Sequence, residues 1–107
     1  MRAAAFAILI GVLLCSAGVS AARKPATIRI AIEGMKFSPA SVTVKQGDTV
    51  VWTNNDIVAH TVTSSAGAFD SKVIPPGATF KYVARRKGDF GYVCTLHPPM
   101  AADVKVR

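Results

Sequence analysis

Hydrophobic and polar residues alternate along most of the chain after residue 23, which is the period of a β-strand with one buried face. Ile28, Ile30 and Ile32 alternate with polar or small residues, and Val42 and Val44 repeat the pattern. No stretch beyond residue 23 sustains a helical period. The pattern predicts strands over residues 27–32, 41–45, 49–53, 60–63, 79–83, 90–94 and 103–107.

Segments rich in Gly, Pro, Asn and Asp separate the expected strands and mark turns. They lie at residues 46–48, 54–56, 75–77 and 87–89. Many short strands at intervals of about 8 to 12 residues are typical of an all-β, antiparallel β-sandwich. The bulky residues expected to fill its core are Trp52, Phe80, Tyr82, Phe90 and Tyr92.

The first 22 residues differ in character from the rest of the chain. Arg2 supplies a positive charge, residues 3–19 form an almost unbroken apolar run, and small residues follow at 20–22. This order predicts a secretory signal peptide over residues 1–22, cleaved after Ala22 or Ala21. A membrane anchor is the alternative, but the run is shorter than the ~20 apolar residues of a spanning helix. We therefore expect residues 23–107 to form one exported domain in the periplasm, with no membrane insertion after cleavage.

Cysteine usage changes the picture further. The chain has two cysteines, and Cys15 lies inside the apolar run. The exported domain would keep Cys94 alone and could form no internal disulfide. A lone thiol in an oxidising compartment pairs with another chain, stays buried and inert, or is used for chemistry.

The chemistry-bearing segment is Cys94-Thr95-Leu96-His97-Pro98-Pro99-Met100, which spaces a thiolate, an imidazole and a thioether three residues apart. Thiolate and thioether suit Cu(I), imidazole suits both oxidation states, and two His with one Cys and a weak axial Met form a blue-copper site. The second imidazole must be His60, the only other histidine. We expect one copper per chain, cycling between Cu(I) and Cu(II). The expected ligands are His60, Cys94, His97 and Met100.

Four protein ligands leave no open position for a substrate, so we expect a one-electron carrier and no enzyme. Two alternatives stay open. A periplasmic trafficking protein would store or deliver copper without redox cycling, although such Cu(I) carriers tend to lack a thiolate. A structural zinc site would accept Cys94 and two histidines, but zinc has no use for the thioether of Met100.

The charge of the expected domain is basic, with 12 Lys and Arg against 6 Asp and Glu in residues 23–107. The cations are scattered, with one cluster at Arg85-Arg86-Lys87. Export, and the lack of a basic stripe with interleaved aromatics, argue against nucleic acid binding. The charge either steers an acidic protein partner or keeps the surface soluble.

The domain resembles the cupredoxins of the plastocyanin, amicyanin and pseudoazurin group, and its ligand loop is most similar to that of amicyanin. The likeness covers residues 27–107. It is carried by the motifs at residues 37–39, 44–50, 52–56, 60–62, 69–71, 76–77 and 94–100. The resemblance implies a Greek-key β-sandwich with type 1 copper at one end. It also implies a monomeric electron carrier that serves redox partner proteins, for example a dehydrogenase, a cytochrome c, or an oxidase or reductase.

The resemblance also suggests roles for residues around the ligands. The ring of His97 would protrude through an apolar patch and pass electrons. The candidates for that patch are Met35, Leu96, Pro98 and Pro99. Thr61 and Thr95, each following a ligand, would donate a backbone N–H to the cysteine sulfur or tie the two ligand loops together.

Overall fold

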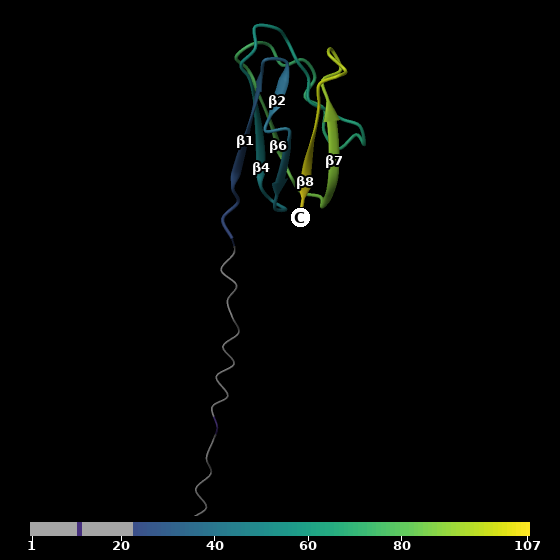
Figure 1. Ribbon diagram of the computed structural model, residues 1–107. Coiled ribbons are helices and arrows are strands. Elements are labelled where there is room, and N and C mark those ends of the chain that lie inside the picture. Colours follow the sequence, from purple (N-terminus) through teal and green to yellow (C-terminus); the bar gives the residue numbers. More distant parts are fainter. Residues whose placement is uncertain (1–10, 12–22) are drawn as a thin grey trace, which may run out of the picture.

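The structure is a computed structural model that describes residue 11 and residues 23–107, and its strands form two layers (Figure 1). The signal peptide expected over residues 1–22 lies outside the described residues, apart from Gly11. In the described part of the chain, no helix is long and apolar enough to cross a membrane. The strands are β1 (Thr27–Glu33), β2 (Lys36–Ser38), β3 (Ser41–Val44), β4 (Thr49–Asn54), β5 (Thr63–Ser64), β6 (Thr79–Val83), β7 (Gly88–Val93) and β8 (Ala101–Val106).

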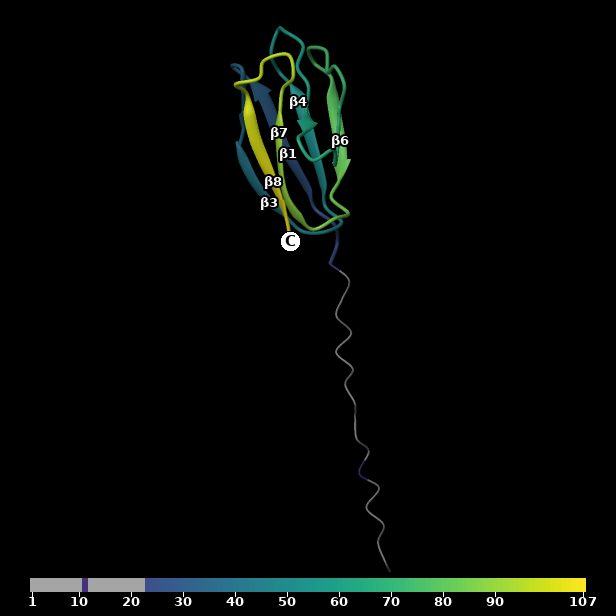
Figure 2. The same cartoon turned by 90° about the vertical axis from the view of Figure 1, so that its right-hand side faces the viewer.

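The two layers are four-stranded sheets in the orders β2-β1-β4-β6 and β3-β8-β7-β5 (Figure 2). The expected all-β sandwich is confirmed. Each sheet is mixed, because β1 and β4 are parallel, as are β3 and β8, whereas the other pairs are antiparallel. The parallel pairs arise because the chain leaves each sheet and returns to it in the same direction, which alternation along a single strand cannot reveal.

Two strand expectations differ from the structure. Instead of a strand over residues 60–63, His60 forms an isolated bridge with Ile74, and β5 begins only at Thr63. The chain before β5 is a loop because side-chain hydrogen bonds, described below, hold it. Strand β2 was not expected, since Phe37 is its one buried residue and a three-residue strand carries no readable period.

The core joins the sheets through Trp52 on β4 and Tyr92 on β7. Both are buried, and the indole Nε1–H of Trp52 donates to the Tyr92 hydroxyl at 3.1 Å. Burial raises the pKa of Tyr92 to about 12, although the bond from Trp52 acts in the opposite direction. Phe69 packs on both rings, while Phe80 and Tyr82 are only half-buried beside them. The expected aromatic core is thus correct, with Phe80 and Tyr82 at its margin.

At the end of the sandwich where the C-terminus lies, Asp48 connects the start of the domain to the turn before β4 (Figure 1). Its carboxylate accepts hydrogen bonds from Ala26 N–H (2.9 Å), Lys45 N–H (2.9 Å) and the Arg23 guanidinium (2.7 Å). These donors, led by the Ala26 N–H, lower the pKa of Asp48 from 3.8 to about 2. The ionised carboxylate therefore stabilises the folded state.

This lowered pKa gives a pH-dependent prediction. Because the folded-state pKa lies below the unfolded value, the contribution of Asp48 is fully present above about pH 4 and disappears as the pH falls toward 2. We expect Asp48→Asn to be less stable than the wild type near neutrality and to lose less stability across that window. Urea unfolding at a series of pH values measures this. Asp89→Asn, which removes an exposed ion pair with Arg107, is the control, and parallel pH curves for Asp48→Asn and wild type would contradict the prediction.

Candidate metal centre

Two loops at the opposite end of the sandwich bring together the residues expected to bind metal. His60 comes from the loop after β4, whereas Cys94, His97 and Met100 come from the loop between β7 and β8. His60 and Cys94 are fully buried, Met100 is nearly so, and His97 is half-buried. Phe90, Tyr92 and Cys94 alternate with more exposed residues, so the sulfur continues the buried face of β7.

The nitrogen and sulfur atoms converge closely enough to share one ion. The Cys94 Sγ lies 3.7 Å from His60 Nδ1 and 3.6 Å from His97 Nδ1, and the three ligand atoms lie within 4.8 Å of one another. Both sulfur–nitrogen distances are below the sum of a metal–sulfur and a metal–nitrogen bond, about 4.3 Å. Met100 lines a surface hollow with His97, Met35 and Pro99, so its side chain lies beside the same imidazole.

Backbone hydrogen bonds hold the second loop in a closed turn. His97 N–H donates to Cys94 O (3.2 Å), Met100 N–H to His97 O (2.9 Å) and Cys94 N–H to Met100 O (3.1 Å). Cys94, His97 and Met100 are spaced three residues apart because each pair of neighbours closes one hydrogen-bonded turn. Pro98 and Pro99 fix two further φ angles between these bonds, which restricts the loop.

Thr61 ties the two loops together, as the resemblance to cupredoxins implied for Thr61 and Thr95. Its backbone N–H donates to the Cys94 Sγ at 3.3 Å. Its hydroxyl oxygen accepts the backbone N–H of Thr95 at 2.9 Å and lies 3.1 Å from the Thr95 hydroxyl. An N–H directed at a sulfur ligand offsets part of a thiolate's charge and orients its lone pairs.

Asp56 is a functional residue that the sequence analysis missed, because it was assigned only to a turn. Its Oδ2 lies 2.7 Å from His60 Nε2 and accepts Met35 N–H at 3.0 Å, while Oδ1 accepts Gly34 N–H at 2.7 Å. Burial raises the pKa of Asp56, but the bonds from Met35, His60 and Gly34 outweigh it, and the pKa is lowered. Because an ionised carboxylate can only accept, this hydrogen bond assigns the proton to Nε2, which donates to Asp56, and leaves the Nδ1 lone pair of His60 facing the sulfur.

The donors to Asp56 come from the two-residue turn between β1 and β2. Gly34 and Met35 have φ of 61° and 60°, the positive values of a type I′ hairpin turn. A methionine in this region is strained by about 1–2 kcal/mol, so the bond to Asp56 helps to hold it there. The only sequence signal for Asp56 was a carboxylate four residues before a candidate ligand.

Asn54 positions Asp56. Its buried side-chain amide donates to Val58 O and Ile74 O, both at 2.9 Å, and its Oδ1 accepts the Asp56 N–H at 3.0 Å. The amide thereby supplies hydrogen-bond partners to three backbone groups of the loops around His60. In the described residues, no buried side-chain nitrogen or oxygen lacks a hydrogen-bond partner.

Comparison of the sequence with known protein families identifies the family to which this fold and these ligand loops belong. Residues 5–106 match the family described as the cupredoxin-like domain. The chain belongs to the cupredoxin family. The amicyanin of Paracoccus versutus is 33% identical over 82% of this cupredoxin and 71% of its own length. The chloroplastic plastocyanin of Tetradesmus obliquus is 28% identical over 81% of this chain and 69% of its own length.

Solved structures agree with the sequence relatives. A Cu(I) amicyanin variant superposes with a TM-score of 0.72 at 28% identity, covering 76% of this cupredoxin and 82% of the other chain. A purple cupredoxin from Nitrosopumilus maritimus gives a TM-score of 0.68 at 28% identity, over 75% of this chain and 99% of that one. The cupredoxin-like fold inferred from the sequence is therefore confirmed.

The donor set fits the metal of this family. One buried sulfur, two imidazole nitrogens and a neighbouring thioether combine the soft and borderline ligands that copper prefers in both oxidation states. The carboxylates near the site do not add hard ligands, because Asp56 is already engaged by His60 and two backbone amides. The cofactor of this cupredoxin is one copper ion.

Removal of Asp56 tests its control of the His60 ring. We expect Asp56→Ala to weaken Cu(II) binding about 10- to 100-fold, because the imidazole loses the acceptor that sets its tautomer and orientation. Asp56→Asn keeps one acceptor oxygen and should lie between Asp56→Ala and wild type. Competition titration against a chelator measures the affinity, and nitrogen chemical shifts of the metal-free protein report the tautomer.

Asp70→Ala is the matched control, since it removes an equal charge from an exposed carboxylate bonded to Lys72. It should leave both the affinity and the His60 shifts unchanged. Wild-type affinity in Asp56→Ala would show that His60 is oriented by packing alone.

Proposed function

We propose that this cupredoxin is a periplasmic type 1 copper protein that carries single electrons between redox proteins. In this proposal His60, Cys94, His97 and Met100 are the ligands. Its amicyanin and plastocyanin relatives indicate a blue copper electron carrier. The observation that carries the ligand assignment is the approach of both Nδ1 atoms to within 3.7 Å of one buried sulfur.

The residues divide the work at the site. Cys94 supplies the thiolate, with Thr61 N–H directed at its sulfur, and His60 and His97 supply the imidazoles. Met100 would be the weak axial ligand that tunes the potential. Bound copper supplies a reversible change between +1 and +2. The hydrogen-bonded loops restrict movement of the ligands, so little reorganisation accompanies the change of charge.

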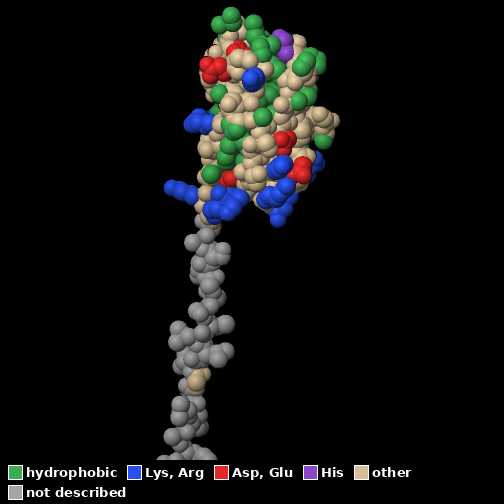
Figure 3. Space-filling view, in the orientation of Figure 1, with side chains coloured by type: hydrophobic (Ala, Val, Ile, Leu, Met, Phe, Trp, Pro, Cys, Tyr) green, Lys and Arg blue, Asp and Glu red, His purple; other side chains and the backbone are tan. Residues whose placement is uncertain are grey.

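The surface around His97 suits electron exchange with a protein partner. His97 is half-buried, and the exposed side chains of Met35 (43%) and Leu96 (49%) lie at the same end of the molecule. Figure 3 shows histidine atoms among hydrophobic side chains at the end opposite the Lys and Arg cluster. We propose that a dehydrogenase, a cytochrome c, or an oxidase or reductase docks here, with the protein acting as a monomeric carrier and not as an enzyme.

The periplasmic location rests on the sequence of the N-terminus. Residues 1–22 have the order of a cleaved signal peptide, and the thiol of Cys94 needs no disulfide partner if it binds copper. Export would place the carrier among soluble redox proteins of the same compartment.

Copper delivery without redox cycling is the competing function. Burial argues against it, because His60 and Cys94 are fully buried and a transfer partner could reach them only after the loops open. The visible spectrum and the reduction potential of the copper-loaded protein distinguish an electron carrier from a copper carrier.

The first test is the visible spectrum of the metal-free protein after addition of Cu(II). We expect an intense blue thiolate-to-copper band that disappears in Cys94→Ser, because the band requires the sulfur ligand. Circular dichroism should show that the variant keeps its β-sheet. A colourless protein that still binds the ion tightly would contradict the type 1 assignment and favour copper storage or a zinc site.

The axial role of Met100 is tested by Met100→Leu. We expect a higher reduction potential, because the more highly charged Cu(II) loses more when a donor is replaced by an apolar side chain. Protein-film voltammetry measures the shift. Ile57→Leu, at an exposed position in the loop between β4 and His60, is the control at the same end of the molecule and should keep the wild-type potential. Identical potentials for Met100→Leu and wild type would remove Met100 from the ligand set.

A further inference from the structure

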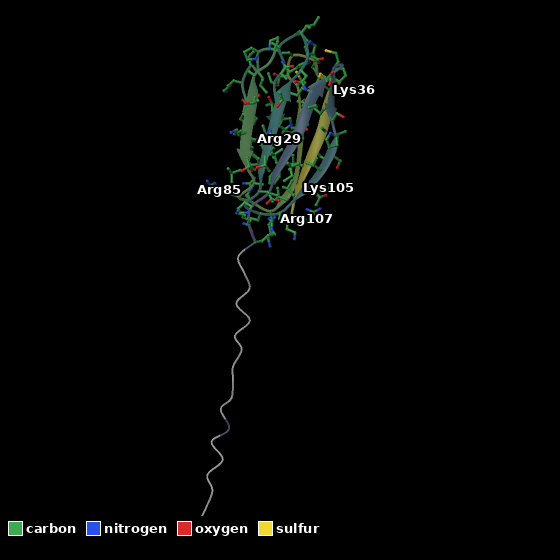
Figure 4. The ribbon with its side chains drawn as sticks, turned by 90° about the vertical axis from the view of Figure 1, so that its left-hand side faces the viewer. Arg29, Lys36, Arg85, Lys105 and Arg107 are labelled. Atoms are coloured by element: carbon green, nitrogen blue, oxygen red, sulfur yellow. The ribbon has the colours of Figure 1, made fainter. Side chains whose placement is uncertain are left out.

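The cations of the domain are concentrated at the end farthest from the metal centre, although they are scattered in the sequence. Figure 4 places Arg85, Lys105 and Arg107 toward this end, Lys36 toward the other, and Arg29 along the side. We call the exposed cations at this end the basic pole. Its members are Arg23, Lys24, Lys45, Arg85, Arg86, Lys87 and Arg107.

Backbone and side-chain contacts hold the basic pole together from four parts of the chain. Gln46 N–H donates to Arg107 O at 2.9 Å, and the Gln46 side chain donates to Arg85 O at 2.7 Å. Arg23 reaches the same turn through Asp48. The folded topology, not the sequence order, therefore creates this charged surface.

Most of the net charge of the domain lies at this pole. Its seven cations face only Asp48 and Asp89, which pair with Arg23 and Arg107. The metal end carries Glu33, Lys36 and Asp56, so it is close to neutral. Within residues 23–107, the other five cations of the pole form no ion pair with a carboxylate, and they are Lys24, Lys45, Arg85, Arg86 and Lys87.

The position of the pole argues against an electron-exchange partner as its occupant. Strand β8 separates Met100 from Arg107, and its six residues span roughly 20 Å at about 3.3 Å per residue. A protein docked on the pole would lie a full strand length from the copper ligands. The pole therefore suits an occupant that holds the domain without exchanging electrons with it.

The positive charge of the pole and its place in the chain favour a membrane surface as that occupant. The apolar run at residues 3–19 joins the domain at Arg23, which belongs to the pole. The basic pole is therefore the part of the domain that directly follows the apolar run in the chain. The metal end, which is close to neutral, lies at the opposite end of the sandwich.

A shallow groove beside the pole offers a seat for an anionic headgroup. Lys81, Arg85 and Arg86 line it, together with Tyr82 and Ala68. The Arg86 guanidinium lies 5.4 Å from the centroid of the Phe90 ring, a cation–π contact that holds it in place. Three cations among apolar lining residues can donate charge-assisted hydrogen bonds to the phosphate of a phospholipid headgroup.

We propose that the basic pole docks this domain on an anionic phospholipid surface, with the metal end directed away from the bilayer. The carrier would then search for its redox partners along the membrane plane while its partner-facing end stays free. The docking itself involves no copper ligand, whereas its consequence for the search for redox partners rests on the proposed function.

Vesicle co-sedimentation of the exported, copper-loaded protein tests the proposal. The vesicles contain phosphatidylglycerol in phosphatidylcholine, or phosphatidylcholine alone. We expect binding only to the anionic vesicles, and weaker binding as salt rises. Replacement of Arg85, Arg86 and Lys87 by Gln should weaken it about 100-fold, at about 5-fold for each cation near the surface.

The charge-matched control replaces Arg29, Lys36 and Lys72, which lie outside the pole, by Gln and should weaken binding only slightly. Thermal unfolding should confirm that both triple variants are folded. Equal losses in the two variants, or equal binding to neutral vesicles, would overturn the proposal. So would a pole variant that binds anionic vesicles normally but transfers electrons slowly to a redox protein, because the pole would then serve a protein partner.

Discussion

Side-chain alternation along β7 fixes where the Cys94 sulfur lies, and the metal centre is built around that position. Tyr92 and Cys94 point to the same buried face, and the Tyr92 hydroxyl accepts the indole N–H of Trp52 from the other sheet. A slip of β7 by one residue would turn both side chains outward, which would break this bond and expose the sulfur. The same register of β7 therefore both packs Tyr92 into the core and places the Cys94 sulfur in the metal centre.

Around that sulfur, hydrogen bonds hold the remaining groups before any ion arrives. Thr61 contacts both the sulfur and Thr95, and Asp56 holds the His60 ring from its other side. These contacts are made by residues adjacent to the ligands or on neighbouring loops, and all are internal to the protein. The conformational entropy of the loops is thus lost during folding and not during metal binding. The same rigid arrangement can therefore hold the ion as Cu(I) and as Cu(II).

The sequence predicted the parts of this arrangement that depend on local patterns. Alternation located most strands, and the three-residue spacing of Cys94, His97 and Met100 identified the second loop. Alternation did not predict the parallel pairing of β1 with β4, because pairing joins residues distant in sequence. The role of Asp56 was also hidden, since it depends on the β1–β2 turn reaching a loop some twenty residues later. The gathering of cations at one end was invisible for the same reason.

The turn at Gly34 and Met35 connects the outer surface to a metal ligand. The Met35 side chain is 43% exposed beside His97, while its backbone N–H donates to the carboxylate that holds His60. Any contact that shifts this turn also shifts the acceptor of the His60 ring, two hydrogen bonds from the solvent. The orientation of one ligand therefore depends partly on a hairpin turn that is not itself part of the ligand set, so a substitution in this turn can alter the centre while all four ligands stay unchanged.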